Sequence, residues 1–456
     1  MRPGRTDFRG LVGLAVPVVT VQVGLMLMGV VDTIMVGHVS AADLAAVALG
    51  NLYFMSTAIL AMGILFGLDP VVAQAVGAGD EPGVSRGIQR GLLTAVLLAT
   101  VGAAVLFPAR AVLTLARQPV EVIPIAAGYV RAALLGMYPF LGFIVFRQTL
   151  QALGRLKSIV FTVILANLVN LFLNWIFVFG HLGVSPMGAV GTGWASTLSR
   201  LFMFAALTTV AWPILGPYLR QRRPEVLRIR PALRMLRLGL PIGLQLSVEY
   251  WAFAATSLLM GLISTVALAG HQVAINMAAL AFMVPLGIGQ ACGVLVGRAV
   301  GGEDPSRARR AAAAGLWLGT GFMTLTAAMF LTLPAVLASI YTSDAAVLAL
   351  AASLLPLAGV FQVFDGLQVV ASGALRGIGD TRAPMIVNFL GFWLLGLPFG
   401  VWLGFGRGLG PAGLWWGLVV GLGAVAIALL ARLRIRFSQD LTRIQIDDPE
   451  EGLSSS

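Results

Sequence analysis

Long apolar runs are the feature that most limits what this chain can fold into. Residues 11–37 hold a single charged side chain, Asp32, and similar runs recur along the 456 residues. In hydrocarbon, every backbone N–H and C=O must find a partner within the protein, which only helices and closed barrels achieve. Barrel strands alternate apolar and polar residues, whereas these runs are continuous. The sequence therefore predicts an all-α polytopic membrane protein.

Short polar or Gly/Pro-rich breaks divide the chain into twelve predicted transmembrane helices. The composition, 58% hydrophobic and 11% charged, is far from the roughly one-quarter charged residues of soluble proteins. A span needs about 20 residues, and the first run is too long for a cleaved signal peptide, so it is expected to be retained. The helices are predicted at 11–37, 45–76, 88–108, 122–149, 157–180, 188–213, 233–262, 266–299, 308–334, 346–375, 382–405 and 412–434.

Basic residues gather in alternate connections. They are dense at 220–237 and 298–310, and nearly absent near His38 and His181, although Arg110 and Arg117 are exceptions. The positive-inside rule then predicts a multi-pass protein with both termini cytoplasmic, and we expect it in the plasma membrane, most simply a bacterial inner membrane. The net charge of +11 follows from this bias and from anionic lipid headgroups. No nucleic-acid partner is expected, because the basic residues lie between spans without interleaved aromatics.

Two halves of the chain resemble one another. LAVP at 14–17 recurs as LGLP at 238–241, and AVGAGDEP at 75–82 recurs as AVGGEDP at 299–305, all near one offset of 224 residues. An even number of helices separates the copies, so they form a parallel repeat of two six-helix lobes, an arrangement typical of alternating-access carriers. We predict an N-terminal lobe (1–213), a cytoplasmic basic linker (214–232), a C-terminal lobe (233–436) and a polar cytoplasmic tail (437–456).

Asp32 and three polar residues fall at similar depth in the first lobe. A charge near the bilayer centre costs roughly 2.5 to 3.5 kcal/mol or more, so a buried carboxylate needs a reason. Asn170 and Asn174 share one helix face by their spacing, and Thr192 lies one turn inside its helix. These hard oxygens suit Na⁺ or a shared proton. The alternative is a clamp in which the two amides merely tie helices together.

Glu249 and Asp365 are predicted at a second, common depth near the midplane of the C-terminal lobe. They lie twelve residues after Arg237 and eleven before Arg376, roughly 17 Å above the basic rim at about 1.5 Å per residue. Two buried carboxylates without an assigned basic neighbour would be suited to exchanging a proton for a cation. Phe361, Tyr250 and Trp251 offer aromatic faces for an organic cation. The alternative for each ring is ordinary helix packing.

Each of the remaining charged residues within the predicted spans has more than one possible role. Asp69, before Pro70, is a candidate gate or a hinge cap. Arg131 and Arg200 could neutralise the acids, meet an anionic substrate or pair and snorkel locally. No nucleophile–base constellation or phosphate loop is found, and Cys292 is the only cysteine, so neither an enzyme, nor a cofactor, nor a metal site beyond Na⁺ is expected.

Several segments resemble the multidrug and toxic compound extrusion (MATE) family over essentially the whole chain. They are VDTIMVGHVSAADLAAVALG (31–50), DPVVAQAVGAGD (69–80), QALGR (151–155) and GALRGIGDTRAPM (373–385). The acids at 32, 249 and 365 are similar to those that mark the NorM-like branch. Where some relatives carry a second acid in helix 5 this chain has Asn174, and where some carry a tyrosine it has Phe361.

The resemblance implies two six-helix bundles around a V-shaped cavity. It also implies efflux of cationic amphipathic drugs coupled to inward Na⁺ or H⁺ by alternating access, with a coupling-ion site at Asp32, Asn170, Asn174 and Thr192. We expect a monomeric antiporter in the lipid bilayer.

Two other readings stay open from the sequence. A lipid-linked precursor flippase shares this lobe architecture, but anionic substrates would want several basic residues facing the cavity, and only Arg131 and Arg200 are candidates. A channel or receptor-like module is disfavoured by the repeat and by the paired acids at matched depth.

Overall fold

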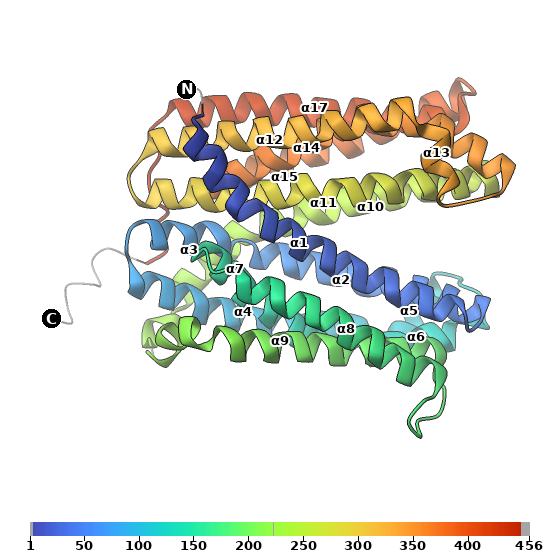
Figure 1. The fold of residues 1–456 in the computed structure, drawn as a ribbon, viewed down its shortest axis with the longest axis horizontal. Helices are drawn as coiled ribbons and strands as arrows, with labels where there is room; N and C mark the ends of the chain where they lie inside the picture. Colours follow the sequence, from blue (N-terminus) through green and yellow to red (C-terminus); the bar gives the residue numbers. More distant parts are fainter. Residues whose placement is uncertain (1–2, 222, 448–456) are drawn as a thin grey trace. The chain divides into compact units, whose positions relative to one another are not determined.

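The computed structural model describes residues 3–221 and 223–447, and these residues form helices joined by short connections (Figure 1). The elements are α1 (Arg5–Gly37), α2 (Ala41–Leu65), α3 (Leu68–Gly77), α4 (Glu81–Leu106), α5 (Ala109–Leu115), α6 (Val122–Leu134), α7 (Met137–Ala152), α8 (Lys157–Phe179), α9 (Gly188–Arg220), η1 (Pro224–Leu227), α10 (Ile229–Ile263), α11 (Thr265–Gly301), α12 (Pro305–Thr332), α13 (Pro334–Ser339), α14 (Ala345–Gly377), α15 (Arg382–Phe389), η2 (Leu390–Gly396), α16 (Leu397–Val401), η3 (Trp402–Gly406) and α17 (Gly410–Ser438).

The predicted all-α membrane fold is confirmed. Within the described residues, eleven helices or helix combinations are long and apolar enough to span a bilayer, and α6 with α7, bent by 47°, forms a twelfth. The predicted span at 45–76 is broken between α2 and α3, where Phe66 and Gly67 separate the two helices. The last span before α17 contains two π-helical stretches, η2 and η3.

The segment predicted as a linker, 214–232, is largely helical. Helix α9 continues to Arg220 and α10 already begins at Ile229, so most of this stretch is helical. Arginine is a good helix former, and it can extend a helix beyond the lipid because its charge is solvated there. Composition marked the end of the apolar run, whereas the helix itself ends later.

The internal repeat is confirmed by the helix bounds. The combined stretch of α2 and α3 spans residues 41–77, and α11 spans 265–301, so both ends lie 224 residues apart. The starts of α1 and α10, and of α4 and α12, are displaced by the same number. The copies differ in detail, because α11 is continuous where its counterpart is broken, and α14 is continuous where α6 and α7 bend.

The helices group into two compact units. Unit 1 contains the chain up to Val19, residues 77–79 and residues 244–445, whereas unit 2 contains 20–76, 80–243 and the segment from Ile446. Helices α1 and α10 therefore each contribute a segment to both units. The predicted N-terminal and C-terminal lobes divide the chain by sequence order, and that division stays a prediction.

In unit 1, α14 packs against α11, α12 and α17 (Figure 1). Glycines permit close approach of α11 and α14: a Cβ added at Gly289 would lie 2.8 Å from the carbonyl oxygen of Val369, and one at Gly373 would collide with the carbonyl of Gly289. Small residues at such crossings are how membrane helices gain packing contacts without a hydrophobic driving force. This contact fixes α14, which carries Asp365.

In unit 2, α8 lies beside α9, and α6 contacts both α2 and α9. Ile446 and Asp447 also belong to this unit. Asp447 accepts hydrogen bonds from Arg86 Nε at 2.7 Å and from the buried Arg90 Nη2 at 2.6 Å. Part of the predicted polar tail is therefore docked, since Ile446 beside this ion pair is buried.

We expect Gly373→Val to destabilise the protein, because the new side chain meets backbone atoms of α11 that cannot move independently of their helix. The loss should be about 1 to 3 kcal/mol, as for overpacking elsewhere. Gly321→Ala in α12 is the matched control, since no atom lies within 4 Å of the added Cβ. Unfolding in detergent measures both, and equal stability of the two variants would contradict the packing argument.

Candidate functional site

The first cluster is built around Asp32 near the end of α1. Its Oδ1 accepts hydrogen bonds from Asn174 Nδ2 at 2.7 Å and Asn170 Nδ2 at 3.1 Å, both on α8. Its Oδ2 accepts one from Ser196 Oγ on α9 at 2.6 Å. Hydrogen bonds to an ionised acceptor are short and roughly twice as strong as neutral ones. Three helices thus converge on one buried carboxylate.

Thr192 belongs to the same cluster without bonding to Asp32. It precedes Ser196 by one turn of α9, so the two hydroxyls share a face. Its Oγ1 and the side-chain oxygens of Asn170 and Asn174 are buried and have no hydrogen-bond partner among the described residues. Unsatisfied buried acceptors are costly. Together with the carboxylate, these oxygens form a donor set that a hard cation or a hydronium-like group could use.

Arg200 is the positive charge of this cluster. It lies on α9 one turn beyond Ser196, and its charge acts on Asp32. Its guanidinium carbon lies 4.3 Å from the ring centre of Phe54 and 5.5 Å from that of Phe140. Aromatic faces stabilise a desolvated cation. Arg200 can therefore balance the charge of Asp32 without forming a direct ion pair with it, which leaves the carboxylate oxygens to their polar donors.

The second cluster contains Glu249 on α10 and Asp365 on α14. The two carboxylates are close enough for their charges to repel one another. Gln368, one turn after Asp365, donates from Nε2 to Glu249 Oε1 at 3.3 Å. Asp365 Oδ1 is buried and has no hydrogen-bond partner among the described residues. The pair is suited to holding one positive charge, because a cation between them would remove the repulsion.

The predicted aromatic residues differ in their surroundings. Phe361 is buried and meets Phe253 and Trp415 edge to face, with ring centres 5.9 and 6.0 Å away. This is the geometry of a packed aromatic core. Tyr250 is half-buried and lies edge to face with Trp251 at 6.1 Å. Phe361 therefore supports the site from within unit 1, and Tyr250 is the more accessible ring.

Asp69 lies buried at the start of α3, directly after the break that follows α2. Its charge acts on Arg147, a fully buried arginine in α7. Arg147 Nη1 donates to Gln22 Oε1 at 3.0 Å, and its guanidinium carbon lies 5.7 Å from the ring centre of Phe66. The predicted gate residue therefore has a buried counter-charge in the same unit.

Three of the residues that shape these clusters were not anticipated from the sequence: Ser196, Gln368 and Arg147. Arg147 had a readable signal, since it is a charge within the predicted span at 122–149. Ser196 and Gln368 had only helical spacing to Thr192 and Asp365, and such residues are common in helices. Arg131, by contrast, is exposed and donates to Ala127 O of its own helix at 3.4 Å.

Two carboxylate clusters, one around the buried Asp32 and one around the buried Asp365, on repeated membrane-spanning helices are typical of a transporter, and the comparisons with known proteins agree. The MatE family profile matches residues 17–176 and again 241–402. The chain is 36% identical to multidrug resistance protein PmpM of Pseudomonas aeruginosa, covering 98% of this chain and 96% of PmpM. It is 37% identical to a probable multidrug resistance protein NorM of Mesorhizobium japonicum, covering 94% of each.

Solved structures show the same fold. The eukaryotic MATE transporter AtDTX14 superposes with a TM-score of 0.85 at 20% identity, covering 95% of this chain and 99% of AtDTX14. An outward-facing multidrug resistance MATE family transporter of the MOP superfamily gives 0.85 at 21% identity, covering 95% and 96%. This chain belongs to the MatE family, as the sequence resemblance indicated, and it is a multidrug efflux transporter of that family.

We expect Arg147→Gln to destabilise unit 2 by about 1 to 3 kcal/mol, because it removes a buried positive charge that acts on Asp69 and donates to Gln22. Neutralising both residues, in Arg147→Gln with Asp69→Asn, should recover a large part of that loss. A double-mutant cycle on unfolding in detergent measures the coupling. Additive losses would show that the two charges act independently.

Proposed function

We propose that the protein is a Na⁺- or H⁺-coupled antiporter that exports cationic amphipathic drugs by alternating access. The observation that carries the proposal is the pair of separate clusters, each with a carboxylate that can take a positive charge. Two independent charge sites allow two different cations to bias the conformations of one protein. A ligand shifts a conformational equilibrium only through its differential affinity for the states.

The coupling ion binds at Asp32 in this proposal, with Asn170, Asn174 and Thr192 supplying further oxygens. Ser196 holds one carboxylate oxygen in place by its 2.6 Å hydrogen bond. Arg200, held over two phenyl rings, balances the carboxylate when the ion has left. When the ion is bound, the charge of Arg200 is stabilised by the faces of Phe54 and Phe140.

The drug binds near Glu249 and Asp365, where a single organic cation relieves the repulsion of two carboxylates. Tyr250 offers a half-buried aromatic face, and Phe361 keeps α14 packed behind the site. Arrival of the coupling ion favours the state that releases the drug. Asp69 acts as a gate whose buried charge is balanced by Arg147.

Further parts of the proposal follow from the charge pattern and from the relatives. The termini face the cytoplasm, the protein resides in the plasma membrane, and it acts as a monomer without a cofactor or enzymatic activity. The names PmpM and NorM support drugs as substrates over a lipid-linked precursor. The exposed Arg131 and the ring-bound Arg200 also offer little for a multiply anionic substrate.

Transport in proteoliposomes tests the proposal. Efflux of a fluorescent lipophilic cation should respond to an imposed Na⁺ gradient or pH gradient. We expect Asp32→Asn to abolish the gradient response, and Glu249→Gln and Asp365→Asn to weaken drug affinity about tenfold, or roughly 1.4 kcal/mol. Glu121→Gln, an exposed carboxylate, is the control. No response to either gradient in the wild type would remove the antiporter assignment.

Thr192→Val distinguishes the two coupling ions. Its hydroxyl has no protein partner among the described residues, so an isosteric methyl group should leave folding intact or improve it. For Na⁺ coupling, the half-saturating Na⁺ concentration should rise about five- to tenfold, the effect of one lost ligand of about 1 kcal/mol or more. For proton coupling, the pH dependence of efflux should stay unchanged.

A further inference from the structure

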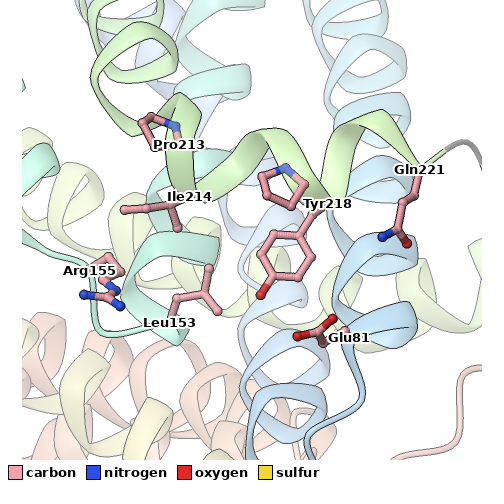
Figure 2. Close-up of a pocket in the computed structure, with 8 residues that line it drawn as sticks. Glu81, Leu153, Arg155, Pro213, Ile214, Tyr218 and Gln221 are labelled. Carbon is pink, nitrogen blue, oxygen red and sulfur yellow. The ribbon is translucent and has the colours of Figure 1, made fainter.

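A cavity of about 400 Å³ lies in unit 2, and none of its lining residues belongs to either carboxylate cluster (Figure 2). Four of its lining residues are polar and four are apolar. They come from the start of α4, the turn after α7 and the last turns of α9, and they are Glu81, Leu153, Arg155, Pro213, Ile214, Pro217, Tyr218 and Gln221. A cavity with this mixture can hold a ligand with both a polar and an apolar part.

The walls of the cavity are fixed by hydrogen bonds. Ser85 Oγ and Gln89 Nε2, on α4, donate to the carbonyl of Tyr218 at 2.6 and 2.9 Å, and Gln89 Nε2 also donates to the carbonyl of Gln221 at 2.7 Å. On the other side, Gly154 has a φ of +69°, so the chain turns sharply between Leu153 and Arg155. These contacts and this turn therefore fix the shape of the cavity.

Two opposite charges flank the cavity. Figure 2 shows Arg155 on one side of Leu153, and Glu81 on the other side, where the Tyr218 hydroxyl points toward it. Within the described residues, neither Glu81 nor Arg155 takes part in an ion pair or a side-chain hydrogen bond. The cavity thus presents one cationic group, one anionic group and a phenol, with apolar residues between them.

The depth of the cavity fits the headgroup layer of a bilayer. Helix α9 has 33 residues, or about 50 Å at 1.5 Å per residue, whereas the hydrocarbon core is about 30 Å thick. Residues 213–220 form the final turns of α9, beyond Trp212, whose ring lies 5.7 Å from the guanidinium carbon of Arg220. Trp and Arg are typical of the interface between lipid and water.

We propose that this cavity binds a zwitterionic phospholipid that carries a primary amine, a phosphatidylethanolamine. Arg155 contacts the phosphate, while Glu81 and Tyr218 accept hydrogen bonds from the ammonium group. Leu153, Ile214 and the two prolines contact the glycerol and the upper acyl chains. The lining charges balance, so an anionic headgroup would place unfavourable charge near Glu81. The quaternary amine of phosphatidylcholine has no N–H to donate.

Native mass spectrometry of the purified transporter tests the proposal with dioleoyl lipids that differ only in headgroup. We expect the wild type to bind phosphatidylethanolamine about three- to fivefold more tightly than phosphatidylcholine, as for one partly exposed ion pair of up to about 1 kcal/mol. Glu81→Gln should remove that preference. Arg155→Gln should weaken binding of both lipids by a similar factor, and Tyr218→Phe should weaken phosphatidylethanolamine about twofold.

Matched control variants distinguish lipid binding in this cavity from a general effect of surface charge. Glu303→Gln and Arg382→Gln alter exposed residues outside the cavity, and they should keep wild-type lipid binding. Thermal unfolding in lipid-free detergent checks that every variant is folded. The binding measurement does not depend on drug transport, so it stands whether or not the antiporter proposal does.

Three results would overturn the proposal. The first is unchanged phosphatidylethanolamine binding in both Glu81→Gln and Arg155→Gln. The second is tighter binding of dioleoyl phosphatidylglycerol than of phosphatidylethanolamine, lost in Arg155→Gln alone, which would make this an anion site. The third is equally tight binding of glycerophosphoethanolamine, which lacks acyl chains; the lipid assignment predicts at least tenfold weaker binding of that probe.

Discussion

A carboxylate inside a membrane-spanning bundle loses the water that would stabilise its charge, and the arrangement around Asp32 follows from that constraint. Three donors from α8 and α9 bond to its two oxygens, and Arg200 balances its charge from a position between two phenyl rings. The same donors join α1, α8 and α9, so the hydrogen bonds that hold these helices together are also the ones that surround the proposed ion site. An ion that entered or left this cluster would therefore act on the packing of three helices.

The two halves of the chain share a duplicated set of helices, but they surround their acidic side chains differently. Unit 2 surrounds a single acid with amides and hydroxyls, whereas unit 1 places two acids together, with Gln368 as the donor to Glu249. None of these acids has an acidic counterpart at the repeat offset. A repeat that conserves helix bounds but not charge supplies two chemically distinct sites. That difference is what an exchanger of two unlike cations requires.

The spans and the positions of the buried acids could be predicted because lipid imposes a strong rule: apolar runs become helices, and charges within them stand out. Asp32, Asn170 and Asn174 were brought together by depth and helical spacing alone. The break at Phe66, the bend between α6 and α7 and the helical part of 214–232 depend on tertiary contacts, which leave little trace in composition. Ser196 was missed because a serine in a helix has many other roles, and only three-dimensional proximity to Asp32 singles it out.

The central claim is that the Asp32 cluster binds the coupling ion and is more than a clamp between helices. The most direct test is equilibrium binding to the purified protein in weakly buffered detergent, with protons released and Na⁺ bound measured as Na⁺ or a lipophilic cation is added. We expect Na⁺ binding or drug-induced proton release in the wild type, and its loss in Asp32→Asn with the fold intact. Wild-type ion binding in a folded Asp32→Asn variant would contradict it.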